Sequence, residues 1–149
     1  MIIVTIAVFL LILTILVVAH EWGHFITARL FGVRVDEFAI GFPPRALKIK
    51  LKNMILSINW LPLGGFVRLK GEQGDDAKDP DSFAAKPIWQ RLIILAAGVG
   101  MNVILAVVLF CIGFNVGMPV DLSDYTGDGI IRDRGVVITQ VLNDSPASR

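Results

Sequence analysis

Two long apolar runs dominate the hydropathy pattern along the chain. Residues 2–18 contain no charged side chain, and a second run covers residues 92–117. Each run has about the ~20 residues that cross a ~30 Å hydrocarbon core as an α-helix. The pattern therefore predicts two transmembrane helices. The first should extend to residue 31, because no proline interrupts the segment that follows it and Gly32 is a typical helix C-terminal signal.

Between the two runs the pattern changes to alternation. Leucine or isoleucine alternates with lysine over residues 47–52, and apolar and polar side chains alternate over residues 56–60. A period of two predicts strands. The Lys52-Asn53 pair that separates them predicts the turn of a β-hairpin at about residues 45–70.

Turn and cap signals divide the rest of this middle segment. The Gly64-Gly65 pair predicts a bend before another short extended piece. Asp81 or Ser82 is a candidate cap for a short helix, and Pro87 is a candidate start for the helix that leads into the second apolar run.

Composition excludes an ordinary soluble domain. Apolar residues make up 54% of the chain, charged residues only 18%, and the mean hydropathy is +0.69. The first apolar run lacks the basic flank of a signal peptide and exceeds the usual length of its apolar core, so we interpret it as a retained helix. A net charge of +1 gives no indication of nucleic-acid binding. Cys111 is the only cysteine, so no disulfide framework is available.

Basic residues concentrate between the two runs. Residues 29–91 hold 11 Lys/Arg against 7 Asp/Glu, whereas residues 119–149 hold 3 against 5. The positive-inside tendency therefore predicts a cytoplasmic middle segment, with both termini outside. Four segments are expected: a first transmembrane helix at 1–31, a cytoplasmic loop at 32–91, a second transmembrane helix at 92–117 and a C-terminal tail at 118–149.

The only two histidines lie in the sequence HEWGH at the end of the first predicted helix. On a helix, His20 and His24 project about 40° apart, so both imidazoles can bind one Zn²⁺. Glu21 beside them is placed to take a proton from zinc-activated water. Ionisable side chains in a membrane helix are costly and therefore indicate function. The structural alternative is a pair of interfacial histidines, with Glu21 facing water.

This motif and three later segments resemble one known family across essentially the whole chain. HEWGH, PLGGFVRLKGE, KPIWQRLIILAAGVGMN and VITQVLNDSPAS follow one another as in the N-terminal part of bacterial site-2 proteases of the regulator-of-sigma-E protease type, peptidase family M50. The resemblance implies an intramembrane zinc endopeptidase with His20 and His24 as metal ligands and Glu21 as catalytic base. It also implies a mainly α membrane protein: two transmembrane helices, a membrane-associated β-hairpin between them and the start of a PDZ-like β-rich domain at 118–149.

The same resemblance suggests substrates and location. Substrates would be single-span membrane proteins such as anti-sigma factors, cut in the bacterial inner membrane. Gly64 and Gly65 would belong to a membrane-associated β-loop that presents the substrate as an added strand. Asn102 matches a family asparagine proposed to hold the substrate backbone, although a hydrogen bond between the two helices explains it almost equally well.

Two departures from the family pattern concern the completeness of the site. Val99 stands where the family has a proline, and no L-D-G segment supplies the aspartate expected as third zinc ligand. Catalytic zinc usually has three protein ligands. We therefore expect the chain to be the N-terminal part of a longer protein, inactive alone, with the aspartate supplied by a C-terminal half.

Two other functions are compatible with the sequence. One is a catalytically incomplete membrane remnant that binds partners through its hairpin or tail. The other is a soluble zinc protease with a membrane anchor, which is disfavoured because the motif lies inside the anchor helix. The hairpin lysines Lys48, Lys50 and Lys52 either protect an edge strand from aggregation or contact anionic membrane lipids.

Overall fold

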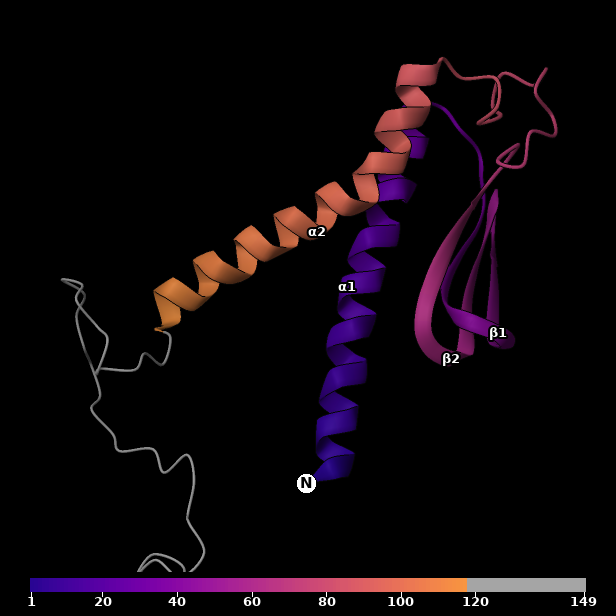
Figure 1. Cartoon of the computed structure of the whole chain (residues 1–149). Helices are drawn as coiled ribbons and strands as arrows, with labels where there is room; N and C mark the ends of the chain where they lie inside the picture. The colour runs from indigo at the N-terminus through magenta and orange to yellow at the C-terminus, as the bar shows by residue number, and fades with distance from the viewer. Residues whose placement is uncertain (118–149) are drawn as a thin grey trace, which may run out of the picture. The chain divides into compact units, whose positions relative to one another are not determined.

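The computed structural model describes residues 1–117 of the chain. Four elements follow one another, as Figure 1 shows: α1 (Ile2–Leu30), β1 (Val35–Leu51), β2 (Met54–Leu69) and α2 (Ile88–Val116). The prediction of two apolar helices with an antiparallel hairpin between them is confirmed. The segment expected to begin a PDZ-like domain lies outside the described residues.

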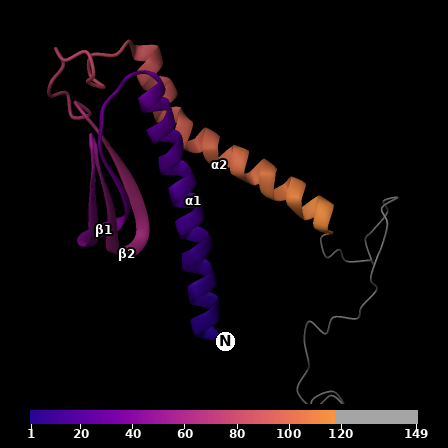
Figure 2. The ribbon, with the colours of Figure 1, turned by 180° about the vertical axis from the view of Figure 1, so that it is seen from behind.

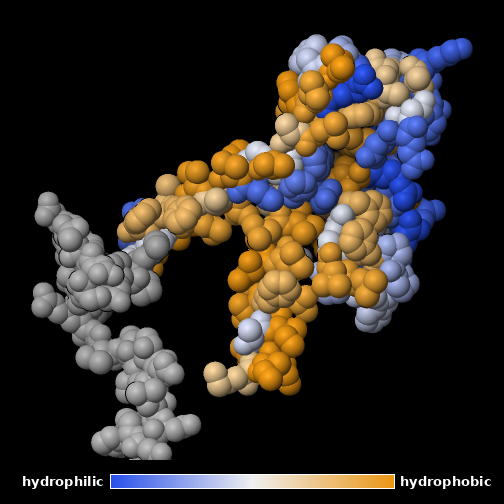
Figure 3. Space-filling view, viewed as in Figure 1, coloured by the Kyte–Doolittle hydropathy of each residue, from blue (hydrophilic) through white to orange (hydrophobic). Residues whose placement is uncertain are grey.

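The two helices have the length and apolar character needed to cross a bilayer. Most of their side chains face outward, and in Figure 3 the hydrophobic colour covers most of α1 and α2. Helices are suited to this environment because all their backbone groups are paired internally. α1 ends at Leu30, one residue before the predicted limit, and Gly32 is the predicted C-terminal signal. Gly32 adopts φ +67°, and its N–H donates to the carbonyl of Arg29 at 3.1 Å.

α2 begins at Ile88, directly after Pro87 as predicted, and four residues before the expected start of the second span. The short helix expected near Asp81 or Ser82 is wrong, because residues 81–86 form turns and bends. Two backbone groups of this segment bond to the residues that flank the sheet. Phe83 N–H donates to the Lys70 carbonyl at 2.7 Å, and the Asp81 carbonyl accepts from Arg34 N–H at 2.9 Å.

β1 and β2 pair antiparallel, with the predicted turn at residues 52–53, and each strand bends back on the other. Phe38 pairs with both Leu56 and Val67, so the first half of β1 lies between two lengths of β2. The second half of β1, residues 45–51, and the end of β2, residues 65–69, therefore form the two outer edges of the sheet.

The end of the sheet opposite the 52–53 turn presents apolar side chains to its surroundings. Phe42 pairs with Leu61 at this end, where both strands bend. Four large side chains there are between 45% and 71% exposed: Phe42, Trp60, Leu61 and Leu63. Such a cluster is expected where a protein meets a membrane or a partner.

The helices cross closely and then diverge, as the opposite views in Figures 1 and 2 both show. Gly23 of α1 is buried at the crossing, where an added Cβ would collide with the backbone carbonyl of Ala97 in α2. A glycine at this position allows the two backbones to approach each other. This close approach brings the HEWGH motif against α2.

Candidate metal centre

The histidines of the motif lie one turn apart on the side of α1 that faces α2. Both are half-buried, and their ring centroids are 4.8 Å apart with an interplanar angle of 78°. The predicted helix therefore brings the two imidazoles together. Each ring is then positioned by a different group of α2.

The backbone carbonyl of Ile94 fixes the imidazole of His24. Its oxygen lies 2.7 Å from Nδ1. A carbonyl can only accept a hydrogen bond, so Nδ1 carries the proton and donates it. The neutral ring then keeps the lone pair of Nε2 free for a metal ion, in the arrangement that orients most metal-binding histidines.

Gly98 leaves an opening into which both Nε2 atoms point. A Cβ added at this residue would lie within 2.6 Å of Nε2 of His20 and of Nε2 of His24. Two nitrogen lone pairs thus converge on one small space that only the absence of a side chain keeps open. Zn–N bonds are about 2.0–2.1 Å long, so the space suits a zinc ion held by both rings.

Asn102 lies against the other face of His20. Its Nδ2 is 3.4 Å from Nδ1 of the ring, and its buried Oδ1 has no hydrogen-bond partner within residues 1–117. A half-turn of the amide places Oδ1 against Nδ1, where it accepts a hydrogen bond from the ring N–H and leaves Nε2 unprotonated. The structure thus brings Asn102 into contact with a predicted ligand across the helix pair.

Glu21 faces the sheet, where Gly65 approaches it. An added Cβ at Gly65 would lie 3.3 Å from Cγ of Glu21, 3.0 Å from Cγ1 of Val17 and 2.8 Å from the carbonyl oxygen of Ala39. Gly65 therefore lets β2 lie directly beside the predicted base. Gly64, the preceding residue, lies against the Phe42 ring.

The donor set fits part of a zinc site. Two imidazoles converge, while within residues 1–117 no third histidine, cysteine or carboxylate completes a cluster of potential ligands. Catalytic zinc usually takes three protein ligands. The described residues therefore provide two ligands and a carboxylate base.

Sequence reasoning predicted Asn102 of α2 but missed two other groups of this helix. The Ile94 carbonyl and the opening at Gly98 surround the histidines as closely as Asn102 does. Only the run of small residues AAGVG gave a signal, since such runs mark close helix contacts. That signal indicates an approach of two helices but not what they enclose.

Two crossing helices, with the two histidines of an H-E-x-x-H motif turned into their contact, define a membrane protein with a centre of the metalloprotease type. The model of peptidase family M50 matches residues 8–145, and the chain belongs to this family. The predicted membership is therefore confirmed, and zinc is the metal of its named relatives.

Three curated relatives illustrate the match. A Thermotoga maritima protein named as a zinc metalloprotease is 43% identical over 106 residues, which are 68% of this chain and 21% of the relative. A Clostridium acetobutylicum protein that carries the same kind of name is 48% identical over 104 residues, which are 70% of this chain and 30% of the relative. An Arabidopsis thaliana protein named as a chloroplastic membrane metalloprotease is 37% identical over 142 residues, which are 93% of this chain and 30% of the relative. The chain spans less than a third of the length of each.

Proposed function

We propose that the chain provides the zinc-binding part of an intramembrane endopeptidase that cuts the transmembrane segments of single-span regulatory proteins, such as anti-sigma factors. The observation that carries the proposal is the convergence of both Nε2 atoms on the opening at Gly98, within two helices apolar enough to span a membrane. In this proposal His20 and His24 hold the metal, and Glu21 is the catalytic base.

The residues divide the chemistry among them. When bound, zinc supplies the Lewis acidity that makes a water molecule a nucleophile near neutral pH. Glu21 would be the base that takes a proton from the attacking water and the acid that returns it to the leaving amine. The Ile94 oxygen holds His24 in its metal-binding tautomer during these steps.

We assign Asn102 to the positioning of His20 instead of to substrate binding. The contact between the two side chains supports this role, as does the lack of any other partner for the buried Oδ1 in the part of the chain that the structure describes. A metal-binding histidine normally has its second nitrogen held by an oxygen acceptor. Asn102 and the Ile94 carbonyl would then play the same role for the two ligands.

The sheet is the proposed substrate platform. A transmembrane helix has its amides paired, so it must unwind before cleavage, and a strand edge offers replacement hydrogen bonds. The edge at residues 65–69 supports this role, because Gly65 lies beside Glu21. The exposed cluster at the opposite end from the 52–53 turn supports insertion of the sheet into the bilayer.

The remaining parts of the proposal concern what completes the site and where it lies. A carboxylate from residues outside the described part would be the third ligand, as catalytic zinc usually requires. The protein would lie in a bacterial inner membrane. The excess of basic residues in the middle segment supports a cytoplasmic location for that segment.

The experiment uses protein expressed from its complete reading frame and a fluorescently tagged single-span membrane protein as reporter. The Glu21→Gln variant should keep its zinc, measured by metal analysis, and lose at least ~100-fold in cleavage rate, the usual worth of a general base. His20→Ala and His24→Ala should lose both zinc and cleavage, while a Gly100→Ala control keeps both. Full cleavage by Glu21→Gln, or normal zinc content in both histidine variants, would overturn the proposal.

A further inference from the structure

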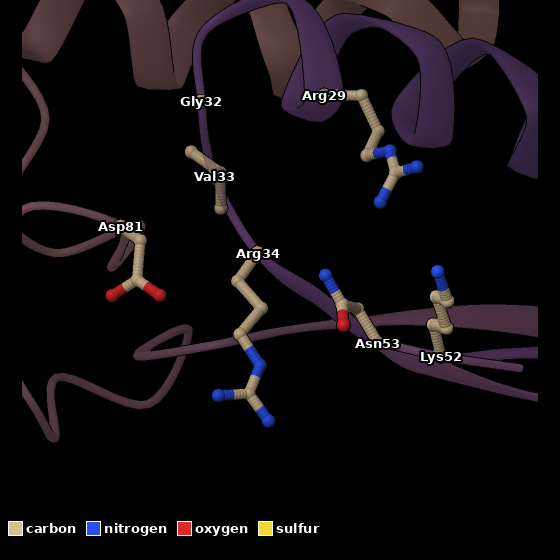
Figure 4. Close-up of a pocket in the computed structure, with 7 residues that line it drawn as sticks. All are labelled: Arg29, Gly32, Val33, Arg34, Lys52, Asn53 and Asp81. Atoms are coloured by element: carbon tan, nitrogen blue, oxygen red, sulfur yellow. The ribbon is translucent and has the colours of Figure 1, made fainter.

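A second hollow lies at the C-terminal end of α1, apart from the metal centre. It has a volume of about 550 Å³ and is shown in Figure 4. Arg29 extends into it from the helix, while Lys52 and Asn53 extend from the turn of the sheet, and the nitrogen atoms of the three side chains point toward one another. Its complete lining is Arg29, Gly32, Val33, Arg34, Lys52, Asn53 and Asp81.

The charges in this hollow that have no ion pair are positive. Arg34 pairs with Asp36 at 3.0 Å. Asp81 pairs at 2.8 Å with the ammonium of Lys70, which Asp79 shares at 2.7 Å. Within residues 1–117, neither Arg29 nor Lys52 pairs with a carboxylate. Two cations and an amide donor therefore face one space without an anion of their own.

The guanidinium of Arg29 is also held in place. It lies 5.6 Å from the centre of the Phe25 ring, in the geometry of a cation–π contact. Such a contact reduces the conformational freedom that a long side chain must otherwise lose on binding a ligand.

The depth of the hollow matches the headgroup layer of a bilayer. From Ile2 to Arg29, a helix that rises 1.5 Å per residue covers about 40 Å. The hydrocarbon core is about 30 Å thick, and a bilayer with its headgroups measures ~40–45 Å. With Ile2 at one surface, Arg29 reaches the headgroups of the other.

A tryptophan next to the hollow marks the same level. Trp89 is 53% exposed and packs edge-on against Phe31, with 5.5 Å between ring centroids. Phe31 directly precedes Gly32, which lines the hollow. Tryptophan is enriched at the membrane–water interface, so this second observation places the hollow near lipid phosphates.

We propose that this hollow binds the phosphate of an anionic phospholipid headgroup. The Arg29 guanidinium, the Lys52 ammonium and the Asn53 amide would donate charge-assisted or neutral hydrogen bonds to its oxygens. Since Arg29 belongs to α1 and Lys52 to the sheet, one bound lipid joins the two elements. It fixes how deep the sheet sits beside the metal centre. The inference goes beyond proteolysis and holds whether or not the chain cuts a peptide.

The test measures lipid retention by native mass spectrometry after purification from nanodiscs containing phosphatidylglycerol and phosphatidylcholine in equal amounts. The wild-type chain should retain phosphatidylglycerol selectively. Arg29→Gln and Lys52→Gln should each weaken retention about fivefold, the usual worth of one cation near an anionic surface. Lys48→Gln is the matched control, because it removes the same charge from β1, the strand that leads into the 52–53 turn, without lining the hollow, and it should change retention little.

Three outcomes would overturn the proposal. Equal retention of both lipids excludes recognition of the anionic headgroup. Equal losses in Lys48→Gln and Lys52→Gln indicate a general attraction to the positive sheet. Displacement of the lipid by millimolar inorganic phosphate assigns the hollow to free phosphate instead. Circular dichroism of each variant checks that its helix content is unchanged.

Discussion

Substitution of Gly98 by alanine tests the arrangement of the metal centre most directly. The new methyl carbon would lie 2.6 Å from Nε2 of His20 and nearer still to Nε2 of His24, whereas real contacts of Cβ atoms are essentially never shorter than 3.0 Å. To open 2.6 Å to 3.0 Å, the His20 ring must move by about 0.4 Å, twice the ~0.2 Å that zinc–ligand distances tolerate. The methyl group also fills the space that the ion requires.

We therefore expect Gly98→Ala to bind zinc at least ~100-fold more weakly, at or beyond the upper end of the effect of losing one orienting contact. The assay is competition with a chromophoric chelator, using protein in detergent micelles. Gly100→Ala is the matched control on the same helix, because nothing lies within 4 Å of its added Cβ. Circular dichroism should show the same helix content for both variants.

One result would refute this reasoning. If Gly98→Ala binds zinc as tightly as the wild-type chain while Gly100→Ala also does so, the two Nε2 atoms do not share an ion at this opening. The roles assigned to both histidines would then have to be abandoned.

Three further predictions concern the surroundings of the centre. Asn102→Leu should weaken zinc binding by ~10–100-fold and shift the proton of His20 from Nδ1, as measured by ¹⁵N NMR; an unchanged tautomer contradicts the positioning role. Gly65→Val should push the sheet away from α1 and lower the cleavage rate by ~100-fold at normal zinc content, since a displacement of about 1 Å can cost that much; an unchanged rate excludes the sheet from presenting substrate. Hydrogen bonding to Lys70 lowers the pKa of Asp81 below its ordinary value of 3.8. The Asp81–Lys70 pair therefore contributes fully to folding stability above pH 3.8, and this contribution is lost as the pH falls through the lowered pKa of Asp81. Lys70→Met should remove this acid dependence of the thermal unfolding temperature, and a variant that keeps it disproves the assignment.

The helices and the face shared by the two histidines were predictable because their signals are local. An uncharged run of the right length specifies a membrane-spanning helix, and the i, i+4 spacing of His20 and His24 specifies that both rings share a side. The 52–53 turn was predictable for the same reason, since alternation on both sides defines a hairpin. By contrast, the Ile94 carbonyl and the opening at Gly98 belong to the backbone of a helix distant in sequence, and residue types alone do not reveal such groups.

The pairing of the first half of β1 with two separate lengths of β2 could not be predicted from local sequence either. Alternation predicts strands but does not say that residues 35–40 will lie between two lengths of β2, because register depends on partners far along the chain. The prediction of a short helix near residues 81–86 was wrong for a related reason. Asp81 and Ser82 have the chemistry of helix caps, yet hydrogen bonds to Arg34 and Lys70 hold this backbone in another conformation.

A single buried carboxylate explains how the sheet keeps its doubled register. Glu37 lies in the first half of β1, and its side chain, only 2% exposed, contacts every other part of the sheet. Arg45 of the second half donates to both carboxylate oxygens at 3.0 Å, Ser57 donates at 2.8 Å, and Arg68 at the opposite edge lies 3.5 Å away. The observed pairing brings all three partners to this one charge.

The contacts of Glu37 lead to a prediction that distinguishes its ion pair with Arg45 from packing of the two side chains alone. Arg45→Met should lower the free energy of unfolding of the sheet by about 2 kcal/mol, the worth of hydrogen bonds to a charged group. The loss stays below the ~3–5 kcal/mol of a fully buried pair, because Arg45 is 43% exposed and Arg68 still faces the charge. Adding Glu37→Gln should recover at least half of the loss, since no uncompensated charge is then buried. Thermal unfolding of both variants in micelles measures the difference, and losses that simply add would show that Glu37 does not need Arg45 in order to stay charged inside the sheet.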